Sequence, residues 1–452
     1  MAQSAEQMQM QTNKKRVLVI GLGKTGLSCA RYLLARGYEV AVTDSREHPP
    51  ALDQLREELP DVALFLGGFD EQAFAHADEL VVSPGVSLKE PLIQAAMQRG
   101  VSVTGDVEIF AQAVHAPVIA ITGSNGKSTV TSLVGVMARE DGRDARVGGN
   151  LGTPPLDMLQ EGEPDLYVLE LSSFQLEYTR SLHVQAAAVL NISEDHMDRY
   201  SSLNEYIEAK RRIFQHADVM VLNRDDPHVM AMADTGRKMI SFGLDAPQPG
   251  QYGLRQREGA QWLCRGDEFL LAQSALLIPG LHNLANAMAA LALGEAAGFD
   301  MQSMLRALQG FKGLPHRTQF VLERDGVRWY NDSKGTNIGA AEAALLGMPG
   351  KVVLIAGGEG KGADFTRLRD AVAQKARAVV LIGRDARLLE KALQGTVTLR
   401  HAADMEDAVV QARALAESGD AVLLSPACAS FDMFRGFDHR GDVFMEAVRR
   451  LA

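Results

Sequence analysis

The sequence lacks the features that mark secreted, membrane-spanning and nucleic-acid-binding proteins. Its only cysteines, Cys29, Cys264 and Cys428, are far apart, so we expect neither a disulfide framework nor a zinc site. No apolar run approaches the ~20 residues that a membrane-spanning helix needs. Acidic residues outnumber basic ones and give a formal net charge of −11, which argues against nucleic acid or an anionic membrane as the main partner.

The start of the chain also lacks an apolar core of the kind that a signal peptide needs. Residues 1–15 are polar and rich in glutamine. We therefore expect a flexible tail over residues 1–15 and a cytoplasmic protein. The acidic balance still permits small anionic ligands, because single loops and helix ends can attract them locally.

Short apolar runs alternate with helical patterns along the chain, which is typical of parallel sheets with helical crossovers. The strand patterns lie at 16–20, 39–43, 80–82, 118–121, 166–171, 187–192, 352–356, 378–382 and 421–424. The helical patterns lie at 27–36, 128–139, 204–217, 286–297 and 337–346. Residues 248–270 contain several short runs that indicate a small β insertion.

The length of 452 residues and the hydrophobic content of 46% favour several domains with large cores. We expect boundaries that divide the chain into segments 1–105, 106–313 and 314–452. The fold class predicted is α/β with three domains: a Rossmann-like N-terminal domain, a central P-loop-type ATPase domain and a Rossmann-like C-terminal domain.

The most informative stretch is Thr122-Gly-Ser-Asn-Gly-Lys127-Ser-Thr, which follows an apolar strand pattern and opens a helix. Glycines let backbone N–H groups turn toward an anion, and the N-terminus of the helix adds partial positive charge. A lysine can then reach the β- and γ-phosphates, and a hydroxyl after it can bind Mg²⁺. Ile121 stands where the common form of this motif has its first glycine, so this is a shortened variant. A phosphate-binding role is much favoured over a purely structural turn.

A second glycine motif, Gly21-x-Gly23-x-x-Gly26, precedes Asp44 at the spacing of a dinucleotide fingerprint. Taken alone it indicates NAD, but the same turn serves any α/β fold that brings a phosphate to a helix end. Three interpretations stay open: a tight turn only, an NAD site, or another nucleotide whose ribose or base contacts Asp44.

Two strand-end segments offer metal ligands near the phosphate loop. Glu170 follows one strand pattern and is suited to Mg²⁺, with a solvated acid as the alternative. His196 lies in Glu194-Asp-His-Met-Asp198 after another, where a polar turn is equally plausible and a second metal is the other possibility. Lys210 stands beside Arg211 and Arg212, and composition alone predicts a basic face in solvent.

The remaining candidates lie further along the chain. Asn283 and Asn286 share one helix face and either bind a nucleotide or cap the helix. Three polar or glycine-rich loops, 331–337, 357–362 and 425–432, follow strand patterns in the third segment. They are either ordinary βα loops or an anion-binding half-site that faces the phosphate loop.

These motifs, in this order, resemble those of the Mur ligases, the ATP-dependent amide-forming enzymes of peptidoglycan precursor synthesis. The resemblance rests on the loop at 122–129 and on Glu170-Leu-Ser-Ser-Phe-Gln-Leu-Glu177, Asn191-Ile-Ser-Glu-Asp-His196, His282-Asn-Leu-Ala-Asn286 and Leu314-Pro-His-Arg317. It runs from about Arg16 to the end of the sequence. The turn at 21–28 and the loops at 331–337 and 425–432 are similar to those of the branch that adds D-glutamate.

The resemblance implies a role for each candidate residue. For ATP it implies Gly123, Asn125, Gly126, Lys127, Ser128, Thr129, Asn283, Arg317 and Asp332. For Mg²⁺ it implies Ser128, Glu170, His196 and a Lys210 that CO₂ has carbamylated, which reverses the solvated-face interpretation. For the UDP-linked substrate it implies Thr25, Asp44, Ser45, Arg46, Ser83, Asn150 and Ser172. For D-glutamate it implies Lys334, Thr336, Lys361, Ser430 and Phe437. The residues expected to be catalytic are Lys127, Lys210, His196 and Lys361.

The activity implied is the ATP-dependent joining of D-glutamate to UDP-N-acetylmuramoyl-L-alanine through an acyl phosphate, by a monomer that needs no membrane or nucleic acid. Three alternatives differ from it. An NAD-dependent oxidoreductase leaves the Lys127 loop unexplained, and a regulatory nucleotide-binding module has no ligase chemistry. A sister ligase, such as an L-alanine-adding enzyme or a folylpolyglutamate synthase, differs in its acceptor.

Overall fold

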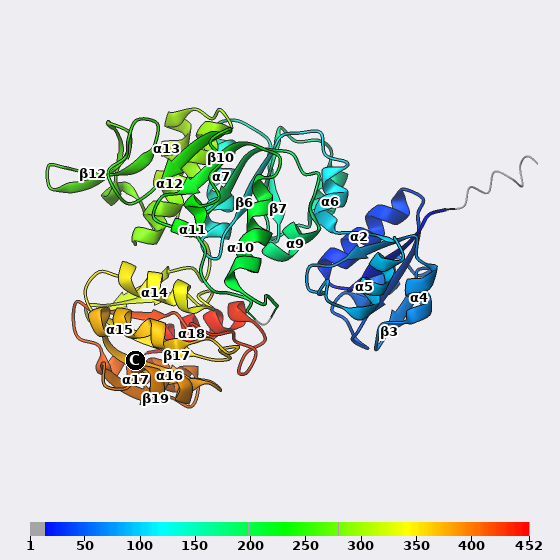
Figure 1. The fold of residues 1–452 in the computed structure, drawn as a ribbon. Helices are drawn as coiled ribbons and strands as arrows, with labels where there is room; N and C mark the ends of the chain where they lie inside the picture. Colours follow the sequence, from blue (N-terminus) through cyan, green and yellow to red (C-terminus); the bar gives the residue numbers. More distant parts are fainter. Residues whose placement is uncertain (1–13, 198, 279, 452) are drawn as a thin grey trace, which may run out of the picture.

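The structure is a computed structural model that describes residues 14–197, 199–278 and 280–451. Most of the tail expected over residues 1–15 therefore lies outside the described residues. Three β-sheets follow one another along the chain, each covered by helices on both faces (Figure 1). This confirms the predicted three-domain α/β fold. In the part of the chain that is described, no helix is both long and apolar enough to cross a membrane.

The N-terminal sheet is parallel throughout, in the order β3-β2-β1-β4-β5. Its strands are β1 (Arg16–Ile20), β2 (Glu39–Asp44), β3 (Ala63–Leu66), β4 (Glu79–Val82) and β5 (Ser102–Thr104). Its helices are α2 (Lys24–Ala35), α3 (Leu52–Glu58), α4 (Glu71–His76) and α5 (Pro91–Gln98). Alternate residues of β1 face opposite cores, Val17 and Val19 on one side and Leu18 and Ile20 on the other.

Helix α2 begins at Lys24, three residues earlier than the predicted start at residue 27. The cause is a close approach inside the glycine motif. A Cβ on Gly26 would lie 1.9 Å from the carbonyl oxygen of Gly21. The helix therefore begins within the motif, and its third glycine lies in the first turn.

The central sheet has the order β14-β13-β12-β11-β10-β9-β6-β8-β7. Its strands are β6 (Val118–Thr122), β7 (Ala145–Gly149), β8 (Leu166–Glu170), β9 (Val184–Val189), β10 (Ala217–Asn223), β11 (Lys238–Phe242), β12 (Tyr252–Arg257), β13 (Ala260–Arg265) and β14 (Glu268–Ala272). Strands β12 to β14 form an antiparallel meander that extends the parallel sheet. The β insertion expected at 248–270 is this meander.

Helices cover both faces of the central sheet. They are α6 (Asp106–Ala111), α7 (Lys127–Glu140), α8 (Pro155–Met158), α9 (Ser173–Tyr178), α10 (Leu203–Arg211), α11 (Pro227–Met230), α12 (Leu281–Ala296) and α13 (Met301–Gly310), with short 3₁₀ turns η1 (Leu159–Glu161), η2 (Arg212–Phe214) and η3 (Gln273–Ala275). Strand β6 lies between β8 and β9, so all three end at the same edge.

Three predicted elements of this domain have different bounds. The strand expected at 187–192 is β9, which ends at Val189 because the next residues turn to hydrogen-bond the phosphate loop. The helix expected at 204–217 ends at Arg211, since the chain enters β10 at Ala217. The helix expected from 286 begins at Leu281, one turn earlier.

The C-terminal sheet has the order β15-β16-β20-β17-β18-β19, parallel except for the β15–β16 pair. Its strands are β15 (Gln319–Arg324), β16 (Val327–Asn331), β17 (Val352–Gly357), β18 (Ala376–Ile382), β19 (Thr398–His401) and β20 (Ala421–Leu424). Its helices are α14 (Ile338–Gly347), α15 (Arg369–Lys375), α16 (Ala386–Leu393), α17 (Met405–Leu415) and α18 (Phe437–Arg450), with the 3₁₀ turn η4 (Phe365–Leu368).

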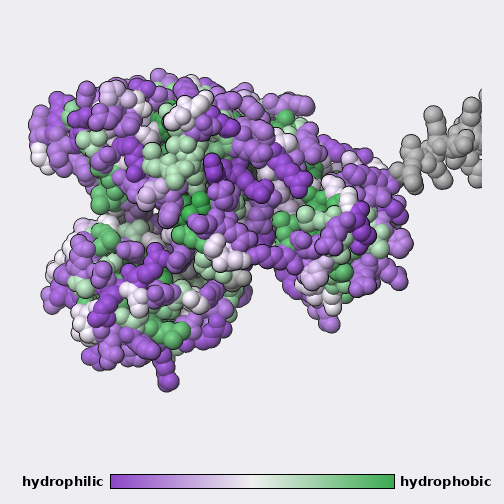
Figure 2. Space-filling view, viewed as in Figure 1, coloured by the Kyte–Doolittle hydropathy of each residue, from purple (hydrophilic) through white to green (hydrophobic). Residues whose placement is uncertain are grey.

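The central domain lies between the other two (Figure 1). Helix α14 of the C-terminal domain contacts α12, and α2 of the N-terminal domain contacts α8. Figure 2 shows a hollow between the central and C-terminal domains, with apolar side chains along it. The carboxyl ends of β6, β8 and β16 meet near this hollow, which is where α/β domains bind ligands.

Candidate active site

The loop between β6 and α7 has the geometry of an anion-binding turn. Gly123 and Gly126 have φ angles of 152° and 83°, which favour glycine. Strand β6 continues to Thr122, and Ile121 pairs with Glu170 in β8, so the loop itself is short. Ile121, which stands where the common motif has its first glycine, therefore belongs to strand β6, where no glycine is needed.

The chain after β9 fixes the shape of this loop. Asn191 accepts a hydrogen bond from the backbone N–H of Asn125 at 2.8 Å and donates one to its carbonyl at 3.1 Å. The backbone of Ser193 donates to Ser124 Oγ at 2.9 Å. Asn191 stands in a motif that the sequence analysis quoted without giving it a role, so its part in shaping the loop was missed.

Two lysines meet at the carbonyl oxygen of Gly123. Lys127 Nζ donates to it at 2.8 Å and to the carbonyl of Ser124 at 2.9 Å. Lys210 Nζ donates to the same Gly123 oxygen at 2.9 Å. Burial lowers the pKa of both ammonium groups, that of Lys210 well below its usual value, and the charge of Lys127 lowers the pKa of Lys210 further.

Composition alone predicted that Lys210 belongs to a basic face in solvent, and the structure shows that this prediction is wrong. Lys210 is 1% exposed, whereas Arg211 and Arg212 are exposed. Its ammonium lies 4.6 Å from the ring centroid of Tyr206, one turn earlier on α10. Burial of Tyr206 and Lys210 on one face of α10 turns the lysine toward the phosphate loop.

Glu170 ends β8 next to the phosphate loop, and one of its oxygens has no partner. Oε1 accepts a hydrogen bond from Asn150 Nδ2 at 2.7 Å, while the buried Oε2 has no hydrogen-bond partner among the described residues. The whole residue is 3% exposed. A buried carboxylate oxygen without a donor is costly, and a bound cation would satisfy it.

Ser128 lies at the start of α7 and accepts a hydrogen bond from Arg317 Nη2 at 2.7 Å. His196 lies on the loop after β9 with a φ of 57°, and its side chain is 41% exposed. Its ring packs edge-on against Phe174, with 4.7 Å between centroids. Across residues 14–197, 199–278 and 280–451, no three His, Cys, Asp or Glu side chains form a group that could hold a metal.

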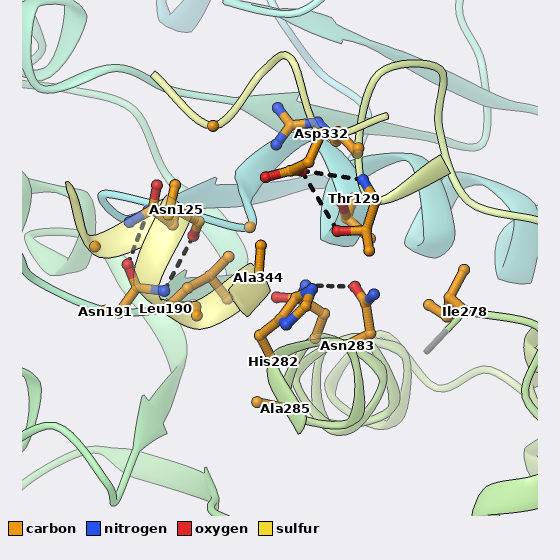
Figure 3. A pocket seen from close by; sticks show the side chains of 18 of the residues that line it. Asn125, Thr129, Leu190, Asn191, Ile278, His282, Asn283, Ala285, Asp332 and Ala344 are labelled. Carbon is orange, nitrogen blue, oxygen red and sulfur yellow. Dashed lines mark hydrogen bonds between the residues drawn. The ribbon is translucent and has the colours of Figure 1, made fainter. Parts of the chain in front are cut away.

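A cavity of about 340 Å³ lies between the central and C-terminal domains (Figure 3). It brings together six of the nine predicted ATP contacts, namely Asn125, Gly126, Thr129, Asn283, Arg317 and Asp332, whereas Gly123, Lys127 and Ser128 do not line it. Asp332 and Lys334 line it from the C-terminal side. Asn283 and His282 project from α12, and Asp332 and Thr129 lie on the facing side.

One carboxyl group and one imidazole of this cavity have shifted pKa values. Burial raises the pKa of Asp332 to about 6, although Ser425 Oγ and the backbone of Thr318 donate to its carboxylate at 2.7 and 3.0 Å. Burial lowers the pKa of His282 to about 4. His282 was quoted next to Asn283 in the sequence motif but received no role, so its place in the lining of the cavity was missed.

The loops expected to bind D-glutamate follow the carboxyl ends of β16, β17 and β20 in the C-terminal sheet. Lys334 Nζ lies 3.8 Å from the ring centroid of Phe437, and burial lowers its pKa to about 8. Ser430 is buried, whereas Thr336 and Lys361 are exposed. Glu359 and Ala429 pair through backbone hydrogen bonds, so the loops that carry Lys361 and Ser430 lie side by side.

A second cavity of about 490 Å³ lies between the N-terminal and central domains. Most predicted contacts of the UDP-linked substrate line it: Thr25, Asp44, Ser45, Arg46, Ser83 and Asn150. Gln175, which the sequence analysis did not select, lines it too. Ser172 has a local role, since its hydroxyl caps α9 by accepting from the backbone of Gln175 at 3.2 Å.

Asp44 is buried and already paired within its own domain. Its carboxylate accepts from the backbone of Leu22 at 2.7 Å and from Arg46 Nη2 at 2.7 Å. Burial alone would raise the pKa of Asp44, but the hydrogen bonds from Arg46 and Leu22 outweigh burial and keep that pKa below its usual value. The aspartate therefore also fixes the position of Arg46.

Three family models match successive parts of the chain. The Mur ligase MurD-like N-terminal domain matches residues 15–105, the Mur ligase middle domain residues 121–294, and the Mur ligase glutamate ligase domain residues 316–428. The chain belongs to the Mur ligase family. The three matches together span most of the sequence.

Characterised relatives and solved structures agree with this membership. A Nitrosococcus oceani protein named UDP-N-acetylmuramoylalanine--D-glutamate ligase is 56% identical over 436 residues, 96% of each chain. A Thiobacillus denitrificans protein of the same name is 54% identical over 467 residues, 98% of each chain. A Thermotoga maritima MurF ligase solved in complex with ADP matches with a TM-score of 0.62 at 18% identity, over 98% of this chain and 97% of that one. At that identity the structural match shows the fold alone.

The geometry of this Mur ligase suits a magnesium ion at the phosphate loop. The orphaned Oε2 of Glu170 and the hydroxyl of Ser128 are hard oxygen donors, which Mg²⁺ prefers. Magnesium usually completes its shell with water and substrate phosphates, so a small number of protein oxygens can hold it. The donor set of the Mur ligase thus fits Mg²⁺ better than a transition metal.

Proposed function

We propose that this Mur ligase joins D-glutamate to UDP-N-acetylmuramoyl-L-alanine, with ATP hydrolysed to ADP and phosphate. The observation that carries the proposal is the identity above 50%, over nearly the whole chain, to proteins named for this reaction. The two interdomain cavities and the shortened phosphate loop support it, because the reaction needs two nucleotides bound at once.

The reaction begins with transfer of the γ-phosphoryl group of ATP to the alanyl carboxylate. A bond forms between a carboxylate oxygen and the γ-phosphorus, and the bond from that phosphorus to the β–γ bridging oxygen breaks, which gives ADP and an acyl phosphate. Lys127 binds the phosphate chain and offsets the repulsion between the two anions. Asn283, Arg317 and Asp332 hold the nucleotide in the cavity between the central and C-terminal domains.

The second step is attack of the amine of D-glutamate on the acyl phosphate. The neutral amine adds to the acyl carbon, the tetrahedral intermediate expels phosphate, and the ammonium proton is lost to solvent. Lys334, Thr336, Lys361, Ser430 and Phe437 orient the amino acid. Lys334 is the best supported of these, because it also lines the ATP cavity.

The UDP-linked substrate lies in the cavity between the N-terminal and central domains. Thr25, Ser45, Arg46 and Ser83 contact its uridine diphosphate end, and Asn150 contacts the end that reacts. Asn150 supports this direction, since its amide is hydrogen-bonded to Glu170 at the carboxyl edge of β8. Asp44 positions Arg46 for the same ligand.

Magnesium, when bound, neutralises phosphate charge and polarises the phosphorus–oxygen bonds. Ser128 and Glu170 would hold one ion, and His196 and a carbamylated Lys210 would hold a second. For the second ion, the buried amine of Lys210 reacts with CO₂ to give a carbamate, with loss of one proton. Its depressed pKa supports this reaction, because only the neutral amine attacks CO₂.

An acceptor screen tests the function. Purified protein is given ATP, Mg²⁺ and UDP-N-acetylmuramoyl-L-alanine, and ADP release is measured with D-glutamate, L-glutamate, L-alanine or no amino acid. We expect release that depends on D-glutamate and on the UDP-linked substrate. Release with L-alanine and none with D-glutamate would instead assign the chain to a sister ligase.

A further inference from the structure

Arg440 is a buried arginine beside the loops assigned to D-glutamate. It lies on α18 and is 1% exposed, and among the fully buried side chains of the described residues only that of Trp329 is larger. Its Nε donates to Ser333 Oγ at 3.0 Å and its Nη2 to the carbonyl of Ser333 at 2.8 Å. Its Nη1 donates to the carbonyls of Cys428 and Ala429 at 3.1 and 3.3 Å.

These hydrogen bonds join two loops that are almost a hundred residues apart in the sequence. Ser333 belongs to the loop after β16, next to Lys334, and Ala429 belongs to the loop after β20, next to Ser430. Ser333 Oγ also donates to the carbonyl of Phe437 at 2.7 Å. Arg440 thus fixes the backbone just before Lys334 and Ser430, and through Ser333 it also reaches the carbonyl of Phe437.

The charge of Arg440 is not neutralised by a direct partner. Within the described residues, each hydrogen bond that it donates goes to a hydroxyl or a carbonyl and none to a carboxylate. A buried guanidinium without a bonded carboxylate is costly, and Asp432 and Asp332 act on its charge only through space. An anion placed near these loops is attracted through a medium of low dielectric constant.

We propose that Arg440 is a positioning residue for the acceptor amino acid: it fixes the Lys334 and Ser430 loops relative to each other, and its charge attracts a carboxylate of the acceptor to them. This inference rests on the proposed function, since the acceptor is taken to be D-glutamate. It concerns only the second half of the reaction. Formation of the acyl phosphate, which uses the other two sites, does not depend on it.

Two variants of Arg440 and one control separate the effects of charge and geometry. Arg440→Lys keeps the charge but loses the fork of donors, and Arg440→Met loses both. Arg449→Met is the control, because Arg449 lies exposed on the same helix. We measure KM for D-glutamate, ATP and the UDP-linked substrate, the melting temperature, and the exchange of labelled ADP into ATP with the UDP-linked substrate present and D-glutamate absent.

We expect KM for D-glutamate to rise about 10-fold in Arg440→Lys and about 100-fold in Arg440→Met, from the loss of charged hydrogen bonds. The other KM values and the exchange rate should stay within about twofold of wild type. If both Arg440 variants bind D-glutamate as Arg449→Met does, or if exchange falls in parallel, the proposal is wrong. If neither folds, Arg440 is structural only, which also overturns it. A wild-type protein without D-glutamate-dependent ADP release would refute the proposed function instead.

Discussion

Arg317 of the C-terminal domain donates a hydrogen bond of 2.7 Å to the hydroxyl of Ser128, at the start of the helix that follows the phosphate loop. The two residues are separated by 189 positions in the sequence. Arg317 lines the cavity between the domains and is partly buried, and this desolvation lowers its pKa. One side chain therefore links closure of the C-terminal domain to the residue proposed to hold magnesium.

We predict that Arg317→Lys lowers kcat/KM for ATP by about 10- to 100-fold, the loss expected for a charged hydrogen bond of ~1.5–3 kcal/mol. Lysine keeps the charge but lacks the planar fork that reaches Ser128. Initial rates of ADP release at varied ATP measure the effect. Arg306→Lys, at an exposed position on α13, should behave as wild type. Equal rates for both variants would show that the link to Ser128 is dispensable.

Glu170→Gln should lose activity without losing stability. The substitution removes a buried carboxylate whose Oε2 has no hydrogen-bond donor, so we expect the free energy of unfolding to stay equal or to rise by about 1 kcal/mol. Activity should fall at least ~100-fold, because a magnesium ligand is lost. Urea unfolding and ADP release measure the two effects.

A magnesium titration identifies the cause of that loss. The melting temperature of the wild type with ADP should rise when Mg²⁺ is added, and that of Glu170→Gln should rise less. Glu163→Gln, an exposed change just before β8, is the matched control and should respond as wild type. A full magnesium response in Glu170→Gln would remove Glu170 from the set of ligands.

Lys210 should require CO₂ for its function. We expect activity to fall in CO₂-depleted buffer and to return with bicarbonate. A carbamate signal in ¹³C NMR should appear with ¹³CO₂ in the wild type and in Arg211→Ala, and not in Lys210→Ala. Lys210→Ala should be inactive and Arg211→Ala active. Full activity of Lys210→Ala in bicarbonate buffer would contradict a role for the carbamate.

The sheets and the phosphate loop could be predicted from the sequence because both depend on local pattern. An apolar run such as Val118–Thr122 buries both faces, and the glycines after it allow the positive φ angles of a tight turn. The environment of Lys210 depends on tertiary packing, so composition alone wrongly predicted that Lys210 lies on the solvent-facing side of α10. The spacing of Tyr206 and Lys210, four residues apart on one face, was the signal that could have corrected it.

Contacts between domains could not be predicted, because they leave no signal in the local sequence. Arg317 and Ser128 are joined only because two separately folded domains meet, and the same holds for the two walls of the ATP cavity. Nothing in the local sequence distinguishes Arg440, since its burial depends on how α18 packs against the loops after β16 and β20. Residue roles of this kind came from family resemblance or from the structure.

Lys334 should give the enzyme a pH-dependent affinity for D-glutamate. Its pKa is lowered to about 8, chiefly by burial, so the ammonium is charged below that pH and neutral above it. Attraction for a substrate carboxylate is therefore lost as the pH rises through about 8.

Arginine in place of Lys334 keeps its charge across this range. The ratio of kcat/KM for D-glutamate, Lys334→Arg over wild type, should rise between pH 7 and pH 9 on the order of several-fold, because a titrating charge is replaced by a fixed one. A constant ratio would exclude Lys334 as a carboxylate contact, and titration of the substrate amine cancels in the comparison.

Gly126→Ala should damage the phosphate loop in two separable ways. Gly126 has a φ of 83°, and a Cβ there would lie 2.4 Å from Oδ1 of Asn286. Gly142, at the end of α7, has a φ of 79° with nothing within 4 Å of its Cβ position. Gly142→Ala should therefore lose only ~1 kcal/mol of unfolding free energy to backbone strain, with unchanged KM for ATP. Gly126→Ala should lose about 1–3 kcal/mol more through overpacking and should bind ATP at least ~10-fold more weakly, because Asn286 must move. If urea unfolding and ATP kinetics gave the same values for both variants, strain alone would explain the glycine, and the contact with α12 would have no part in shaping the loop.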